Sequence, residues 1–253
     1  MGSRNYLPIL LLLVVIFTGC SSTRKLTYFN DIAKITGTDS VNRPSQLKVQ
    51  PGDILQITIT TIDKDVSLLF NPNIGSTTTA GNNIEQGYLV DSSGNITLPV
   101  IGKVYVKDKT TTTITSEVAA ELAKNIRNAY VSTRLINFRV SVLGDVARPG
   151  SYKVTAERAT LLDALSMAGD LNTTARRDDI MIIRETDGIK TYTSLNLNDS
   201  KTLSSPYYYL SNNDVIYIKP GPNRPFATSR TIQLLPAILS LISLATTIII
   251  LSK

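Results

Sequence analysis

Apolar and polar residues alternate in short blocks along the middle of this chain, a pattern typical of strands with one buried face. The block ILQITIT, residues 54–60, follows the turn residues Pro51 and Gly52 and predicts a half-buried strand. Asp53, which joins this turn to the strand, is expected to accept hydrogen bonds from backbone amides of the turn. Residues 63–86 become rich in Asn, Thr and Gly, which predicts a long loop.

The next blocks predict a hairpin, a helix and another strand. Residues 88–90 and 96–98 are expected to pair through the turn of residues 91–94. A helix is expected to begin near Glu117, because threonine and serine hydroxyls before it can cap a helix start. Its buried stripe has helical spacing and comprises Val118, Leu122, Ile126 and Ala129. The block INFRVSV at 136–142 then predicts a strand with one face in contact with solvent.

Beyond residue 141 the order is strand, turn, strand, helix, strand and strand, which is typical of a β-grasp fold. Gly144 and the pair Pro149-Gly150 mark turns near the first two strands. The later strands are expected at residues 180–183 and 192–195. The predicted fold class is therefore α+β, with two small modules.

The helix of this second unit has recognisable signals at both ends. Thr160, with Asp163 three residues later, forms a variant of the capping box. Gly169 occupies the position just after the helix that favours glycine. The stripe expected to be buried comprises Leu161, Leu162, Leu165 and Ala168.

Two stretches far apart in the chain have a similar pattern. LKVQPGDILQI and LSNNDVIYI share the order Leu, turn, Asp and alternating apolar residues, so that Asp53 and Asp214 occupy equivalent positions. The similarity indicates either equivalent turns in the two modules or only the general pattern of a turn followed by a strand.

The N-terminal apolar run, residues 7–17, predicts a secretory signal peptide. At roughly 1.5 Å per residue, its 11 residues are too short to span a hydrocarbon core of about 30 Å as a helix. It is followed by small residues and by Cys20, the only cysteine of the chain. We predict cleavage between Gly19 and Cys20 and lipid attachment to Cys20; the alternative is an ordinary signal peptide with an unpaired thiol.

The C-terminal apolar run, residues 231–252, has no charge and follows a proline-rich linker at 220–230. As a helix it would extend about 33 Å, which predicts a single transmembrane helix. Its polar members project within an arc of roughly 80° and suggest a packing surface or a lumen lining: Gln233, Pro236, Ser240, Ser243 and Thr247. In the alternative interpretation, the hydroxyls bond their own helix backbone. The composition is compatible with a position in either the outer or the inner membrane.

Composition and charge narrow the function classes. The 253-residue chain has no His, which removes the commonest general base and metal ligand. Phosphate-binding loops, nucleophile elbows and metal-ligand spacings are also missing from the sequence, so that we expect neither an enzyme nor a cofactor or metal site. The acidic pair Asp178-Asp179 follows Arg176-Arg177 and is interpreted as a solvated strand start. Removing residues 1–19 lowers the formal charge from +6 to +5, with scattered cations that do not indicate a nucleic-acid partner.

Taken in order, these blocks resemble the polysaccharide export outer-membrane lipoproteins of the Wza type. The matching pieces are Pro51-Gly52-Asp53 with its strand, DSSGNITLPVIGKV, the helix from Glu117, and VLGDVARPGSY leading into TLLDALSMAGDL. The first group resembles the N-terminal domain of that family, and the second resembles a β-grasp domain of the SLBB type. The chain departs from the family pattern in having Phe17 where a Leu is usual before the lipidated cysteine, DKTTTTITSE in place of Gly-x-Thr before the helix, and one β-grasp domain instead of two.

The resemblance implies a homo-oligomeric ring that passes a capsular or exopolysaccharide through the outer membrane, with its bulk in the periplasm and lipid at Cys20. It also implies an inner-membrane polysaccharide co-polymerase as a partner. The alternative is a periplasmic lipoprotein adaptor that forms no pore. The expected organisation is a signal peptide at 1–19, a tether or loosely docked arm at 20–44, the export N-terminal domain at 45–140, the SLBB domain with a returning strand at 141–219, the linker at 220–230 and the transmembrane helix at 231–252.

Overall fold

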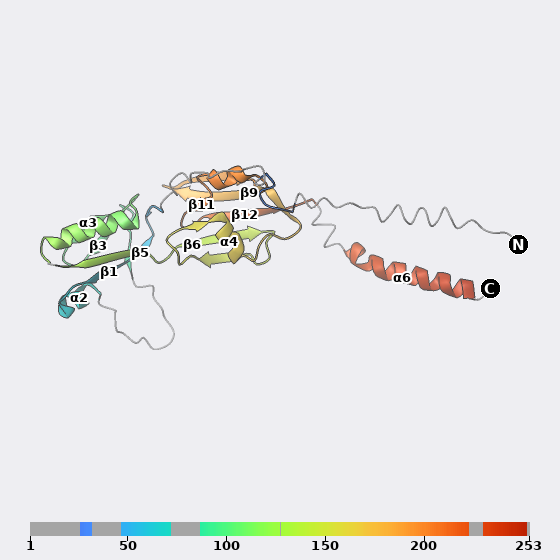
Figure 1. The fold of residues 1–253 in the computed structure, drawn as a ribbon, viewed down its shortest axis with the longest axis horizontal. Helices are drawn as coiled ribbons and strands as arrows, with labels where there is room; N and C mark the ends of the chain where they lie inside the picture. The colour runs from blue at the N-terminus through green and yellow to red at the C-terminus, as the bar shows by residue number, and fades with distance from the viewer. Residues whose placement is uncertain (1–25, 32–46, 72–86, 127, 223–229, 252–253) are drawn as a thin grey trace.

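The structure of the chain is a computed structural model that describes residues 26–31, 47–71, 87–126, 128–222 and 230–251. Figure 1 shows two groups of strands with their helices, and a further helix near the C-terminus. We call residues 47–135 the first module, residues 138–220 the second module and residues 26–31 the arm. The mixed α+β class predicted from the sequence is confirmed for the two modules.

The first module contains a three-stranded antiparallel sheet in the order β2-β1-β5 and a separate hairpin of β3 and β4. Leu55, Ile57 and Ile59 on one side of β1 share a buried core with Ile114 and Val118 of helix α3. The elements are β1 (Ile54–Thr60), α2 (Lys64–Phe70), β2 (Tyr88–Leu89), β3 (Asn95–Leu98), β4 (Gly102–Tyr105), α3 (Thr111–Ala123) and β5 (Tyr130–Leu135).

Three predictions for this module were wrong in detail. Residues 88–89 do not pair with β3; β2 lies beside β1, and the partner of β3 is β4. Helix α3 begins after the N-cap Thr110, so that the threonine run forms its first turns instead of preceding it. The loop expected at 63–86 contains helix α2, which is capped by Asp63 and buries Phe70 in the core.

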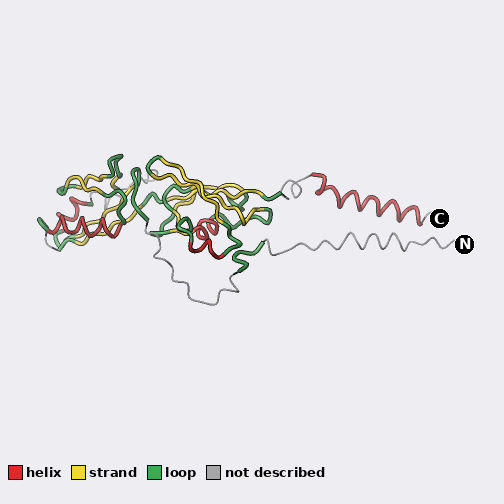
Figure 2. Tube along the Cα trace, turned by 90° about the horizontal axis from the view of Figure 1, so that it is seen from above, coloured by secondary structure: helices red, strands yellow, loops and turns green. Residues whose placement is uncertain are grey.

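The second module has a five-stranded sheet in the order β10-β9-β12-β6-β7. The central strands β12 and β6 are parallel and the other pairs are antiparallel, while β8 and β11 form a small separate pair. Figure 2 shows the strands of the two modules as distinct groups, each with helix beside it. The elements are β6 (Arg139–Gly144), β7 (Gly150–Lys153), β8 (Ala159–Thr160), α4 (Leu161–Met167), β9 (Ala175–Thr186), β10 (Ile189–Leu195), η3 (Ser200–Ser204), β11 (Tyr209–Leu210) and β12 (Val215–Pro220).

Helix α4 follows the sequence signals closely. Thr160 and Asp163 form the reciprocal hydrogen bonds of a capping box, and Gly169 has a φ of +76°, which suits glycine after a helix end. The helix buries Leu161 and Leu165 against the sheet, although Leu162 is only partly buried. The predicted boundary at 140/141 falls inside β6, because Val140 already belongs to the core of the second module.

The apolar C-terminal run forms helix α6 (Arg230–Leu251), which includes Pro236. In the part of the chain that the structure describes, no helix combines the length and the apolar character that crossing a membrane requires. Pro236 and the polar residues Ser240, Ser243 and Thr247 interrupt the apolar sequence of α6. The helix itself was predicted correctly, but its assignment as a transmembrane helix is not supported.

Candidate functional site: paired turns, a docked arm and a polar network

Asp53 and Asp214 close turns of the same geometry in the two modules. Asp53 Oδ2 accepts a hydrogen bond from the backbone N–H of Gln50 at 2.9 Å. Asp214 Oδ2 accepts one from the backbone N–H of Ser211 at 2.7 Å. In both turns the aspartate therefore binds the amide three residues before it, which is the local role that the sequence suggested.

The residue before each aspartate is a second shared feature. Gly52 has a φ of +88° and Asn213 has a φ of +65°. Positive φ costs little for glycine and is tolerated by asparagine, and it strains most other residues. The two stretches are thus equivalent in backbone conformation as well as in sequence.

The two carboxylates differ in what else they bind. Asp214, 1% exposed, accepts hydrogen bonds from Arg184 Nε at 2.9 Å and Nη2 at 2.7 Å. Asp53, 2% exposed, instead accepts a bond at 2.7 Å from the side-chain amide of Asn212. Burial raises the pKa of Asp53, although the bonds from Gln50 and Asn212 partly oppose that rise.

Two asparagines link the modules through these turns. Asn137 accepts from the N–H of Ile54 at 2.9 Å and donates to the carbonyl of Gly52 at 3.1 Å. Asn212, in the turn of the second module, donates to Asp53 Oδ1. Sequence reasoning missed both residues because their partners lie 85 and 159 positions away, where no local pattern connects them.

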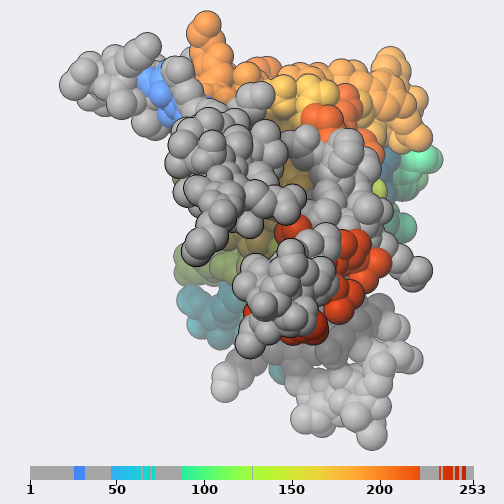
Figure 3. All heavy atoms as spheres, turned by 90° about the vertical axis from the view of Figure 1, so that its right-hand side faces the viewer, coloured from blue at the N-terminus to red at the C-terminus, as the bar shows by residue number. Residues whose placement is uncertain are grey.

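The arm is docked on the second module. The N–H of Phe29 donates to the carbonyl of Leu197 at 2.8 Å, and that of Asn30 donates to Asn198 at 2.9 Å. The Asp31 carboxylate accepts bonds from the backbone N–H and the hydroxyl of Ser200 at 2.9 and 2.7 Å. Figure 3 shows the arm as a blue patch against the second module. This part of the predicted tether is therefore held by paired backbone.

Tyr28 provides the side-chain part of this docking. Its hydroxyl donates to Asp170, and its ring lies 5.7 Å from the guanidinium of Arg177. Arg177 is only 6% exposed and donates to the carbonyls of Asn172 and Ala175, both at 3.3 Å. Burial and the neighbouring Asp170 raise the pKa of Tyr28.

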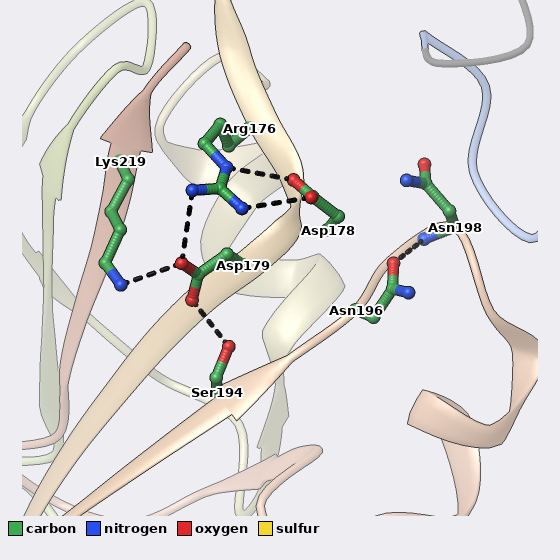
Figure 4. A network of polar contacts seen from close by, with 7 residues as sticks. All are labelled: Arg176, Asp178, Asp179, Ser194, Asn196, Asn198 and Lys219. Atoms are coloured by element: carbon green, nitrogen blue, oxygen red, sulfur yellow. Dashed lines mark hydrogen bonds and ion pairs between the residues drawn. The ribbon is translucent and has the colours of Figure 1, made fainter. Parts of the chain in front are cut away.

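The acidic pair that follows Arg177 belongs to a polar network (Figure 4). Asp179 accepts hydrogen bonds from Lys219 Nζ at 2.7 Å and from the hydroxyl of Ser194 at 2.6 Å. Arg176 binds Asp178 with two nitrogens at 3.2 and 3.0 Å and lies 3.6 Å from Asp179. The bond from Lys219 lowers the pKa of Asp179, and the bond from Arg176 lowers the pKa of Asp178. The network ties β9 to its neighbours β12 and β10.

Gly144 and the Pro149-Gly150 pair mark the two ends of the loop between β6 and β7. Gly144 has a φ of +98° and lies so close to β12 that an added Cβ would be 2.0 Å from the carbonyl oxygen of Ile218. Only glycine fits this approach, which allows β6 and β12 to pair along their length.

The polar stripe of α6 bonds its own helix at two positions. Ser240 Oγ donates to the carbonyl of Ala237 at 2.8 Å, and Thr247 Oγ1 donates to that of Ser243 at 2.9 Å. These are the intrahelical bonds of the alternative interpretation. The side chain of Gln233 and the predicted cleavage and lipid site at Gly19 and Cys20 lie outside the described residues.

The residues that the structure describes contain no cluster of three or more His, Cys, Asp or Glu that could hold a metal ion. The buried and partly buried polar groups described above join turns, strands and modules. Their arrangement is suited to fixing the shape of the two modules.

Comparison with known proteins gives matches over both modules. Residues 41–136 match the polysaccharide biosynthesis/export protein family, and residues 138–218 match the SLBB domain. The boundary between the matches lies at the segment where Asn137 links the modules.

Two curated relatives match more than half of the chain. One is the EPS I polysaccharide export outer membrane protein EpsA of Ralstonia nicotianae, 31% identical over 153 residues, or 58% of this chain and 40% of that protein. The protein of the same description from Ralstonia solanacearum is 29% identical over 150 residues, or 56% of this chain and 39% of that protein. The matched region thus spans about 40% of the length of these relatives.

Proposed function

Because this chain belongs to the polysaccharide export family, we propose that it is an outer-membrane export protein that forms a homo-oligomeric ring and passes a capsular or exopolysaccharide to the cell surface. The observation that carries the proposal is the succession of an export domain and an SLBB domain, in the order and over the residues where the two modules fold. The relatives named as polysaccharide export outer membrane proteins support both the cargo and the membrane.

A ring channel requires subunits that keep their shape while a polymer moves past them. The links through Asn137 and Asn212 to the turn at Asp53 fit this requirement, because they hold the modules to each other. Transport of this kind needs a hydrated wall and no catalytic group. An inner-membrane polysaccharide co-polymerase is the partner that would deliver the polymer.

Lipid attachment at Cys20 is the second part of the proposal. The apolar run and the small residues before Cys20 support it, as does the absence of any other cysteine in the sequence. The docked arm begins six residues after Cys20, so that a lipid there would be tied closely to the second module. Mass spectrometry of the membrane-extracted chain should find a diacylglyceryl group on Cys20; an unmodified thiol would contradict this part alone.

Surface polysaccharide in the producing cell tests the export function. Deleting the gene should abolish surface polysaccharide while the polymer or its precursors accumulate inside, and the full chain should restore export. The Glu121→Ala variant, altered on the exposed surface of α3, is a matched control that should restore export equally. Normal surface polysaccharide in the deletion strain would contradict the function.

A further inference from the structure

Among the strands that the structure describes, the five-stranded sheet of the second module has two edges without a paired strand, β10 and β7. Strand β10 is seven residues long and its edge is unusually unprotected, since it contains no proline and a single charged residue, Lys190. Its side chains are largely exposed, including Tyr192 at 65%. Natural proteins usually shorten, charge or cover such an edge, because its free backbone groups can pair with another strand.

The backbone groups that β10 offers can be identified from its hairpin. Asp187 and Gly188 form a two-residue loop with φ values of +53° and +75°, so that Ile189 pairs directly with Thr186. The two residues that flank such a loop exchange backbone hydrogen bonds. From there, the backbone groups of successive residues point alternately toward the paired strand and away from it. The N–H and C=O groups of Lys190, Tyr192 and Ser194 therefore point away from β9, toward the open side.

The opposite edge offers matching groups. The N–H of Val154 donates to the carbonyl of Phe138 at 2.8 Å, which fixes the alternation along β7. Ser151 and Lys153 consequently direct their backbone groups away from β6. Between β10 and β7 the sheet has three antiparallel pairs and one parallel pair, so these two strands run in opposite directions. Strand β7 of one copy beside β10 of the next would therefore form an antiparallel pair.

We propose that β10 of one copy of this chain pairs with β7 of the next, joining the second modules of neighbouring copies edge to edge. The contact is head to tail, the type that closes into rings, and it would remove both open edges. It rests on the proposed ring and assigns the surface that builds it. Beyond β10, the same chain already accepts an added segment, because the arm pairs with Leu197 and Asn198.

Charge selects the register of this pair. Placing Lys153 opposite Lys190 would bring two ammonium groups together, which destabilises a strand pair. Placing Lys153 opposite Tyr192 avoids this contact and lets all four residues of β7 pair with β10, at residues 192–195. Both side chains then lie on the same face of the extended sheet, because Tyr152 and Leu195 occupy the core face.

Disulfide trapping in membranes tests this pairing with the full chain. The double variant Lys153→Cys/Tyr192→Cys should give a ladder of crosslinked oligomers from the dimer upward on mild oxidation. Each single variant and the wild-type chain, which retains Cys20, should give none. The matched control Lys153→Cys/Lys124→Cys, with the second cysteine on the exposed surface of α3, should also give none.

Other outcomes would overturn the proposal in distinguishable ways. A dimer trapped by Tyr192→Cys alone would indicate two-fold pairing of β10 with itself. Rings seen by electron microscopy without the ladder would leave the proposed function intact and reject this edge. A wild-type chain that stays monomeric would reject both.

A second pair of variants separates assembly from folding. Tyr192→Pro removes an N–H on the open side, so that the purified protein should keep its thermal midpoint and lose its oligomeric state. Thr193→Pro removes an N–H that faces β9 and should lower the midpoint itself. Retention of oligomers by a folded Tyr192→Pro protein would contradict the pairing.

Discussion

At the residue scale, Asp53 and Asp214 have the same turn geometry and different energetic roles. Asp214 pairs with the partly buried Arg184, so that its removal leaves a cation without its counter-charge. We predict that Asp214→Ala lowers the free energy of unfolding by about 3–5 kcal/mol. Asp53→Ala loses hydrogen bonds only and should cost about 1–3 kcal/mol. Urea unfolding followed by circular dichroism measures both losses of unfolding free energy. Equal losses would contradict the different roles assigned to the two aspartates.

The raised pKa of Asp53 has a consequence for stability against pH. Because the folded-state pKa lies above the ordinary value of 3.8, the folded protein holds this proton more tightly than the unfolded chain does. The stabilisation from this group is complete below the unfolded pKa and is lost as the pH rises through the folded pKa. Relative to Asp53→Asn, the wild-type chain should therefore lose stability as the pH rises from about 3.8. The urea midpoints of both proteins, measured across this pH range, give their difference in stability. A difference that does not change with pH would contradict the prediction.

At the scale of the elements, Gly144 determines whether β6 and β12 can pair. Gly144→Ala combines positive φ with a Cβ that would meet the carbonyl of Ile218, and we expect a loss of about 2–4 kcal/mol. Gly188→Ala is the matched control, since its φ is +75° but nothing lies within 4 Å of the added Cβ. It should cost about 1 kcal/mol. Similar melting temperatures for the two variants would show that the contact with β12 does not matter.

The elements also show what local sequence can predict. Strand β1 and the capping box of α4 were found because their signals lie within a few residues of one another. The partner of β3 was assigned wrongly because composition identifies a strand and not the strand beside it. Helix α3 began earlier than expected. Threonine has a low helix propensity, so the threonine run gave no local helix signal, and the burial of Ile114 favours the helix there.

In the candidate site, too, local contacts could be predicted from the sequence and contacts between distant segments could not. The local turn contacts of Asp53 and Asp214 were predictable from turn chemistry. Residue spacing could not predict the links through Asn137 and Asn212, because their partners are distant in the chain. The same holds for the buried position of Arg177 under Tyr28.

At the scale of the whole molecule, the arm connects the N-terminal region to the second module. Asp31→Ala removes the acceptor for both bonds from Ser200, and we expect the amides of Phe29 and Asn30 to exchange hydrogen several-fold faster, because the arm opens more often without these bonds. Asp65→Ala, in α2, is the control and should leave these amides unchanged. Unaltered exchange in Asp31→Ala would mean that backbone pairing alone holds the arm.

The proposed ring is tested most directly by electron microscopy of the full chain extracted from membranes in mild detergent. The account predicts closed rings of identical subunits surrounding a central opening, with the second modules adjacent to one another around the ring. Particles that remain monomeric under conditions where both modules are folded would contradict it.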